Sequence, residues 1–179
     1  MIAETLSLAG EKIKLRPFTL EDAPRVQDLV SNWNVASMVA RIPHPYPDGG
    51  AEEWISGHRE RRAAGEDWPF AIEVGDKLVG AVGLSRTESG PFEIGYWIGE
   101  PYWGKGIASE AARVLVEFAF DILGLDHLVS GHFKDNPASG RVLIKVGFLR
   151  SGEEKRFCLA RGEEIDCITL KLTAEKVTR

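Results

Sequence analysis

A glycine-rich turn between a strand pattern and a long helix pattern is the clearest chemical feature of the sequence. It reads Trp103-Gly104-Lys105-Gly106-Ile107-Ala108-Ser109, and its small residues let the chain curl closely around a bound group. The helix that follows would direct several backbone N–H groups, and the positive end of its dipole, toward that group. The turn therefore predicts a phosphate-binding site.

Two common nucleotide-binding motifs do not fit this turn. A Rossmann fingerprint needs a third glycine after Gly104 and Gly106, but Ile107, Ala108 and Ser109 follow. A P-loop needs Ser or Thr directly after its Gly-Lys pair, and Lys105 is followed by Gly106. A dinucleotide enzyme is therefore a weak alternative, and the spacing alone leaves the phosphate compound open.

The elements that must position the turn follow from the hydrophobic pattern. Residues 92–98 are typical of a strand, in which Gly95 indicates a bulge or the close approach of another group. The stretch from 107 to 123 is typical of an amphipathic helix that Gly124 ends. A second helix would begin at the capping residue Asn136 and end at Gly147.

The rest of the chain supplies further elements. Strands are expected at 12–18, 68–74, 78–85, 127–133, 148–159 and 164–172. Helices are expected from 20 to 31, within 33–42, and from 51 to 64 with Asp48 as the cap. This order predicts one mixed α/β sheet containing an antiparallel meander, in a single domain over residues 1–179.

Composition narrows the class of protein. The 179 residues are 44% apolar and 27% charged, as in ordinary globular domains. The net charge of −5 disfavours a nucleic-acid partner and mildly favours a cationic acceptor. No apolar run approaches the roughly 20 residues of a membrane span, and no signal-peptide pattern begins the chain. We therefore expect a cytoplasmic protein with no membrane partner.

The two cysteines are not expected to bind a metal. Cys158 and Cys167 form no CxxC motif, and no histidine stands at zinc-ligand spacing from them. Two reduced thiols and no metal site are the expectation.

Three segments resemble the GCN5-related N-acetyltransferase (GNAT) superfamily, most closely its RimJ/RimL-like branch. They are EIGYWI at 93–98, YWGKGIASEA at 102–111 and DNPASGRVLIKVGF at 135–148. The early RPFTLEDAPRV and PHPYPDGGAEEWI segments are similar to that branch as well, so the resemblance covers almost the whole chain. It implies an α/β fold whose mostly antiparallel, twisted sheet has about seven strands with helices on both faces. It also implies acetyl-CoA as cosubstrate, without a metal.

The resemblance assigns the turn to coenzyme A. The family pattern Gln/Arg-x-x-Gly-x-Gly/Ala maps onto 103–108, with Trp103 where Gln or Arg is usual. Main-chain groups in the family bind the pyrophosphate, so Trp103 is not expected to prevent binding. Lys105 would attract phosphate or remain solvated. The implied cofactor contacts are Trp97 and Ile98 with the pantetheine arm, Trp103, Gly104, Lys105, Gly106, Ile107, Ala108 and Ser109 around the pyrophosphate, and Asn136.

For catalysis, the resemblance implies direct attack of an amine on the thioester. Ser139 matches the serine of the Asn-x-x-Ser pattern and would serve the departing thiolate, whereas the tyrosine acid of other branches is replaced by Leu143. The position of another branch's glutamate base is Gly131, which leaves Glu93 as the base, acting through water. His132 is a weaker alternative, more typical of a packed residue.

The predicted function is thus N-acetyltransferase activity on a primary amine, either a protein N-terminus or a small molecule. His44 and Tyr46, in the proline-rich loop, are expected to contact the acceptor, and the protein is expected as a monomer or homodimer. Because Gly131, Leu143 and Trp103 depart from family positions, a catalytically silent CoA-binding sensor or assembly module is the alternative.

Overall fold

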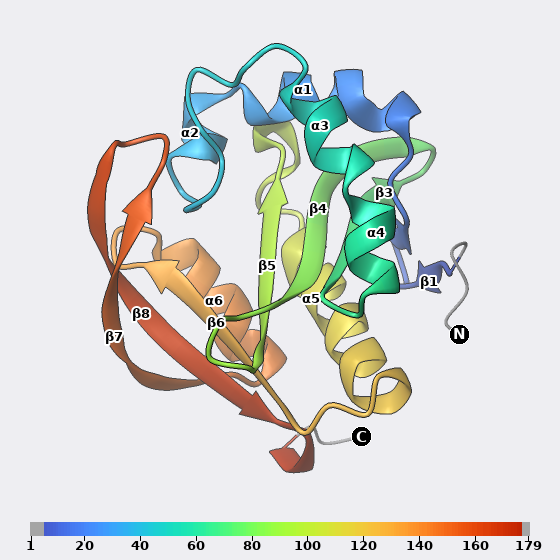
Figure 1. The fold of residues 1–179 in the computed structure, drawn as a ribbon. Coiled ribbons are helices and arrows are strands. Elements are labelled where there is room, and N and C mark those ends of the chain that lie inside the picture. The colour runs from blue at the N-terminus through green and yellow to red at the C-terminus, as the bar shows by residue number, and fades with distance from the viewer. Residues whose placement is uncertain (1–5, 177–179) are drawn as a thin grey trace.

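The computed structural model describes residues 6–176 and contains one eight-stranded sheet in the order β1-β2-β3-β4-β5-β6-β8-β7 (Figure 1). The strands are β1 (Leu8–Ala9), β2 (Lys14–Arg16), β3 (Asp67–Val74), β4 (Lys77–Arg86), β5 (Phe92–Ile98), β6 (His127–Phe133), β7 (Leu149–Cys158) and β8 (Glu163–Thr173). Neighbouring strands are antiparallel except β5 and β6, which are parallel. The predicted mixed, mostly antiparallel sheet is confirmed, with the short β1 bringing the strand number to eight.

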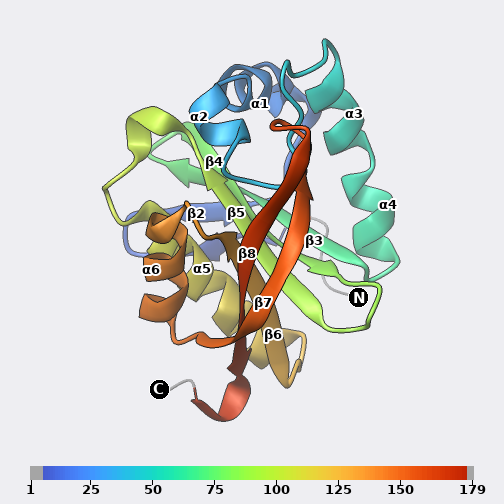
Figure 2. The same cartoon turned by 90° about the vertical axis from the view of Figure 1, so that its left-hand side faces the viewer.

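Helices cover both faces of the sheet, as predicted (Figure 2). One face carries α1 (Ala23–Val30), α2 (Trp33–Ala36), α3 (Gly50–Ser56) and α4 (His58–Ala63). The other carries α5 (Ile107–Glu117) and α6 (Pro137–Val146). Short 3-10 turns stand at Leu20–Asp22, Glu100–Tyr102 and Ala174–Lys176, and a π-helical turn at Phe118–Ile122.

Separate apolar clusters hold the two helical layers on the sheet. The larger cluster joins α5 to the strands, and Ala111, Ala112 and Leu115 are fully buried in it. The small alanine side chains let the backbone of α5 lie close to the sheet, which fixes where its N-terminus points. On the opposite face, Val26 and Ile55 pack α1 and α3 against Ala71 and Leu78.

The helix predicted over 51–64 differs from the observed structure. It is divided into α3 and α4 at Gly57, and its N-cap is Gly49 instead of Asp48. Gly49 has φ 75°, a left-handed conformation that favours glycine over aspartate. The long helix also changes after Glu117 into a π-helical turn, although it still ends at Gly124 with φ 67°.

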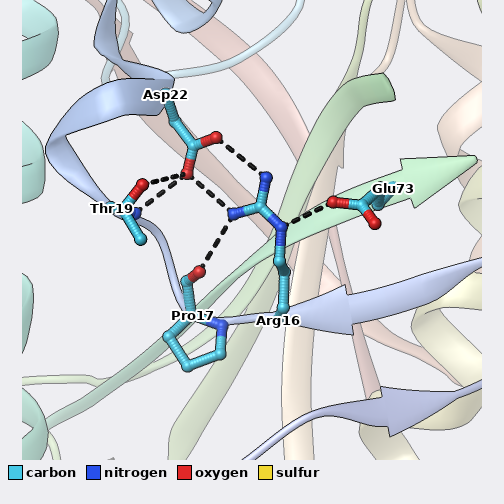
Figure 3. Close-up of polar contacts among 5 residues, drawn as sticks. All are labelled: Arg16, Pro17, Thr19, Asp22 and Glu73. Atoms are coloured by element: carbon cyan, nitrogen blue, oxygen red, sulfur yellow. Dashed lines mark hydrogen bonds and ion pairs between the residues drawn. The ribbon is translucent and has the colours of Figure 1, made fainter. Parts of the chain in front are cut away.

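A cluster of ionic hydrogen bonds ties the first helical turn to the sheet (Figure 3). Arg16 on β2 donates two hydrogen bonds of 2.8 Å to Asp22 and one of 2.6 Å to Glu73 on β3. Asp22 also accepts the backbone N–H of Thr19 at 2.9 Å and completes a capping box with Thr19. Burial alone would raise the pKa of Asp22, but the hydrogen bonds from Arg16 and Thr19 lower it below its usual value.

Asp22→Asn is expected to destabilise the protein by about 2 kcal/mol, because it leaves Arg16 half-buried without its main partner. Since the folded-state pKa of Asp22 is lowered, its contribution is present above its unfolded pKa and is lost as the pH falls through the folded pKa. Urea unfolding at pH 7 and at stepped acidic pH measures both effects. Asp28→Asn, in an exposed pair with Arg25, is the matched control; an equal loss there would contradict the role of the cluster.

His58, at the start of α4, is buried between aromatic rings without a polar partner. Its ring centroid lies 4.4 Å from that of Trp54 and 5.4 Å from that of Phe18, both edge to face. Neither ring nitrogen has a hydrogen-bond partner in the described part of the chain, and burial lowers the pKa of His58 to about 4. The site therefore favours an uncharged, apolar ring.

His58→Phe is expected to stabilise the protein by about 1 kcal/mol at pH 7, since it removes unpaired polar atoms and keeps the edge-to-face contacts. The gain grows as the pH falls from about 6.5 toward 4. In this range the histidine is protonated in the unfolded chain but not in the folded protein, so the unmodified protein loses stability and the Phe variant does not. Thermal unfolding at pH 7 and pH 5 tests this. Equal losses of stability at both pH values would show instead that the larger ring does not fit.

Candidate active site

The central feature of the site is a gap where β5 and β6 separate. The two strands pair only at Phe92 with Leu128 and at Glu93 with Val129. Beyond Glu93 the two strands diverge, and a cleft of 1580 Å³ opens between them. It is lined by residues 94–98 of β5 and residues 130–133 of β6. The diverging ribbons can be followed in Figure 1. The cleft extends from the start of α5 and α6 to the layer formed by α1, α2 and α3.

The glycine-rich turn lies at one end of this cleft. Gly104 and Gly106 have φ 72° and 76°, which favour glycine, and a Cβ atom at either would meet nothing within 4 Å. The first hydrogen bond inside α5 runs from the Glu110 N–H to the Gly106 carbonyl. The preceding N–H groups, from Ile107 to Ser109, thus stand at the open helix end. An anionic group is the ligand that such an end favours.

Trp103 has a structural partner of its own. Its indole N–H donates a 2.7 Å hydrogen bond to the carbonyl of Ile98, while its ring remains 46% exposed beside the turn. The side chain therefore fixes the turn to the end of β5. This contact accounts for a tryptophan at the position where the family pattern has Gln or Arg.

The register of β5 decides which of its backbone groups face the gap. The Gly99 N–H donates to the Val79 carbonyl at 2.8 Å, and hydrogen-bonded positions alternate along an antiparallel pair. The backbone of Trp97 therefore faces β4, whereas the N–H groups of Tyr96 and Ile98 face the gap. Trp97 and Ile98 were both expected to contact the pantetheine arm; in this register the backbone of Trp97 is directed to β4, and the N–H of Ile98 is free to meet a ligand in the gap.

Ser139 lies in the first turn of α6, where several partners hold it. The side-chain oxygen of Asn136 accepts the Ser139 N–H at 3.4 Å, so Asn136 caps the helix as predicted. The hydroxyl of Tyr96 on β5 lies 2.8 Å from the Ser139 Oγ and 3.1 Å from its carbonyl oxygen. Leu143 is fully buried in the core, so a side chain there does not reach the cleft. Tyr96 was missed from the sequence, although strand alternation places it opposite Glu93 and Trp97.

Glu93 lines the cleft in an ion pair. Its carboxylate accepts a hydrogen bond from Arg156 on β7, which also donates to Glu154. Burial alone would lower the pKa of Arg156, but Glu93 and Glu154 raise it above its usual value. Gly131 makes room for this arginine, because a Cβ atom there would lie 3.1 Å from the guanidinium. A charged partner therefore stands beside the residue predicted as the base.

His132 is packed, as the sequence suggested. Its Nδ1 lies 2.8 Å from the Phe133 carbonyl, which can only accept, so Nδ1 carries the proton in this arrangement. The other edge of the ring rests against α6, where a Cβ atom on Gly140 would lie 2.7 Å from Nε2. The ring therefore spaces β6 from α6 beside Ser139.

The loop between α2 and α3 brings one of its two predicted residues into the cleft. Tyr46 lines it, whereas His44 is exposed and its ring packs edge to face on Trp33 at 5.2 Å between centroids. This end of the cleft has a mostly apolar wall, made by Val26, Val30, Val35, Met38, Ile42, Trp54 and Trp97.

Cys158 and Cys167 are buried free thiols, as predicted. Burial raises the pKa of Cys167, which lines the cleft next to Gly131. Within residues 6–176 no cluster of His, Cys, Asp and Glu side chains could hold a metal ion. None of the helices in that range is both long and apolar enough to cross a membrane.

Comparisons with known proteins agree with this geometry. Residues 12–149 match the family model described as an acetyltransferase (GNAT) domain. The probable N-acetyltransferase YjcK of Bacillus subtilis is 33% identical over 154 residues, which cover 81% of this chain and 84% of that protein. The ribosomal-protein-serine acetyltransferase of Escherichia coli is 33% identical over 96 residues, covering 52% and 51%.

Among solved structures, Mycobacterium smegmatis RimJ in complex with CoA-disulfide has the same fold. Its TM-score is 0.84 at 24% identity, and the match covers 98% of this chain and 89% of that one.

Proposed function

The chain belongs to the GNAT acetyltransferase family and is an acetyl-CoA-dependent N-acetyltransferase, and we propose that its acceptor is the α-amine at the N-terminus of a protein. One observation carries the proposal: the gap between β5 and β6 lies within one cleft that runs from a helix end suited to an anion to a mostly apolar wall at the other end. A relative is named for acetylating a ribosomal protein, which supports a protein acceptor here.

The residues at the first end of the cleft fit coenzyme A. The open backbone N–H groups from Gly104 to Ser109 would hold the pyrophosphate, beside Lys105 and the Trp103 ring. The Ile98 N–H would donate a hydrogen bond to the pantetheine arm, as in strand pairing, and Asn136 would contact the cofactor from the start of α6. When bound, acetyl-CoA supplies an activated acyl group.

The residues at the other end fit the terminus of a peptide. Glu93, Gly95 and Trp97 share one face of β5, so an amine beside Glu93 would have its first side chain near the apolar wall at Trp97 and Trp54. Two of the acidic groups that line the cleft form ion pairs, Glu93 with Arg156 and Asp67 with Arg61, and Glu53 and Glu66 line it as well.

The proposed reaction is a direct acyl transfer. The amine nitrogen forms a bond to the thioester carbon, the carbon–sulfur bond breaks, and its electron pair leaves on sulfur. Backbone N–H groups of β5 that face the gap would stabilise the oxygen, and the Ser139 hydroxyl would donate a hydrogen bond to the sulfur. Glu93 would take the proton released by the nitrogen through a water molecule. Tyr46 would contact the acceptor chain at the rim.

Thiol release measured against two panels tests the acceptor class. One panel contains short peptides that differ only in their first residue, and the other contains amino acids, polyamines and aminoglycosides. We expect turnover with the peptides, highest for small or apolar first residues, and at least about tenfold lower kcat/KM for free amines. Turnover with small amines alone would overturn the protein acceptor. Acetyl-CoA binding by calorimetry without thiol release in either panel would favour a catalytically silent module.

A further inference from the structure

A short segment around α2 spans the wide end of the gap between β5 and β6. It comprises residues 32–40, and in Figure 1 α2 lies between the end of β5 and the turn of the β7–β8 hairpin. Its cleft-lining residues are Asn34, Val35, Met38, Val39 and Ala40. We call this segment the α2 bridge, because side chains from both borders of the gap hold it.

The start of the α2 bridge is fixed to the end of β5. The side-chain amides of Asn32 and Asn34 both donate hydrogen bonds to the carboxylate of Glu100, which stands in the 3-10 turn after β5. The hydrogen bond from Asn34 is 2.8 Å long. The side-chain oxygen of Asn32 also accepts the Asn34 N–H at 2.8 Å and so caps α2. The two amide donors lower the pKa of Glu100, which keeps the carboxylate charged at neutral pH.

The end of the α2 bridge is fixed to the turn between β7 and β8. In that turn, the Arg161 Nε donates a 2.8 Å hydrogen bond to the carbonyl of buried Ser37. The two other guanidinium nitrogens donate to the Asp135 carboxylate, between β6 and α6, at 2.6 and 3.2 Å. The Leu159 N–H donates to the Ala40 carbonyl at 3.0 Å. One guanidinium thus joins the bridge, the hairpin turn and the connection that leads into α6.

The two anchors make the gap a closed opening. β5 and β6 form its sides and meet at Glu93 and Val129, and the α2 bridge crosses its wide end. Arginine suits the second anchor, because its planar guanidinium donates in several fixed directions at once. Neither Glu100 nor Arg161 is among the described residues that line the cleft, so each acts on the cleft through the segments that it holds.

We propose that Arg161 is a positioning residue that, with Glu100 at the opposite end, holds the α2 bridge in place over the acceptor. The inference rests on the proposed function, in which the acceptor chain lies between the bridge and β5. The position of the bridge then determines how well the acceptor is held where its amine meets the thioester. The glycine-rich turn that would bind coenzyme A lies at the other end of the cleft and does not depend on the bridge.

Arg161→Met and Glu100→Ala each release one end of the bridge and should have the same kinetic signature. With the most active peptide of the panel above, we expect its KM to rise about tenfold and kcat to fall less than about threefold. The KM for acetyl-CoA should stay within about twofold. Arg150→Met is the matched control, because it removes an exposed guanidinium paired with Glu153 at the other end of β7 and should retain full activity. A higher KM for acetyl-CoA, or an unchanged peptide KM in either variant, would overturn the inference.

Hydrogen exchange of the amides examines the bridge without an acceptor. In Arg161→Met and Glu100→Ala, the amides of residues 35–39 should exchange at least about tenfold faster, while those of β4 and β5 keep their rates. Unchanged exchange in the bridge would overturn the inference, since the anchors would then not hold it. An unmodified protein inactive toward every amine would refute the proposed function, whereas the exchange rates would still confirm or overturn the anchoring of the bridge.

Discussion

Gly95→Phe is expected to lower kcat/KM for acetyl transfer more than about 100-fold while the protein stays folded. Gly95 stands in the middle of β5, between Glu93 and Trp97 on the face that meets the acceptor end of the cleft. A Cβ atom there would meet no heavy atom within 4 Å, and the position is exposed. A phenyl ring would fill the space in which the amine and the thioester must meet.

The same substitution is expected to leave stability unchanged or slightly higher. Glycine inside a strand is unfavourable by about 0.5–1 kcal/mol relative to alanine, so any side chain that does not clash recovers part of this. Activity and stability should therefore move in opposite directions, which separates blockage from misfolding.

The size series Gly95→Ala, Val and Phe measures the available space. We expect a small loss of activity with Ala, an intermediate loss with Val, and the full loss with Phe. The CoA affinities of the three variants, measured by calorimetry, should lie within about threefold of each other. CoA affinity is preserved because the glycine-rich turn lies at the far end of the cleft. Full turnover in Gly95→Phe would show that the acceptor does not pass over this face of β5.

Gly95 also illustrates how a residue type can mark a special position in a strand without showing what it is for. A glycine inside a strand pattern predicted a bulge or the approach of another group. The register between β4 and β5 is continuous from Phe92 to Ile98, so no bulge exists, and no protein atom within 4 Å would oppose a side chain. The glycine keeps space open, and only the placement of the neighbouring elements could show that.

Local signals in the sequence were sufficient where the physical cause is itself local. The glycine-rich turn before α5, the cap Asn136 and the helix end at Gly147 are determined by a few neighbouring residues, and each was predicted. The limits of the strands 127–133 and 92–98 followed from their apolar patterns in the same way. The exception is the start of α3, where a left-handed Gly49 replaced the expected Asp48 cap.

Contacts within the site could not be predicted in the same way, because they join residues far apart in the chain. Tyr96 and Ser139 are 43 positions apart, and Glu93 and Arg156 are 63 apart. Each pair depends on how two elements pack on each other, which periodicity does not specify. Gly131 shows the consequence. In the sequence, glycine at the position of another branch's glutamate base was an argument for a catalytically silent protein. In the structure, the same glycine leaves room for Arg156 beside Glu93.

Glu93→Gln is expected to lower kcat/KM for the acceptor about 100-fold and to leave the KM for acetyl-CoA unchanged. The amide keeps the shape of the side chain but loses the charge that, in the proposed mechanism, faces the amine and takes its proton. Arg156 donates a hydrogen bond to one oxygen of this carboxylate, Oε1. The carboxylate can thus stabilise positive charge on the attacking nitrogen while Arg156 keeps it in place.

Glu154→Gln is the matched control for this variant. Glu154 is the second acid that accepts from Arg156, and its side chain is 47% exposed at the rim of the sheet. Removing its charge weakens the support of Arg156 without touching Glu93, so activity should stay within about threefold of the unmodified protein. Thermal unfolding of both variants measures how much stability each loses with its ion pair to Arg156, so that a loss of activity can be separated from a loss of folded protein. If Glu93→Gln keeps full kcat/KM for every active acceptor, the carboxylate serves only to hold β7 against β5, and another group or bulk water must take the proton.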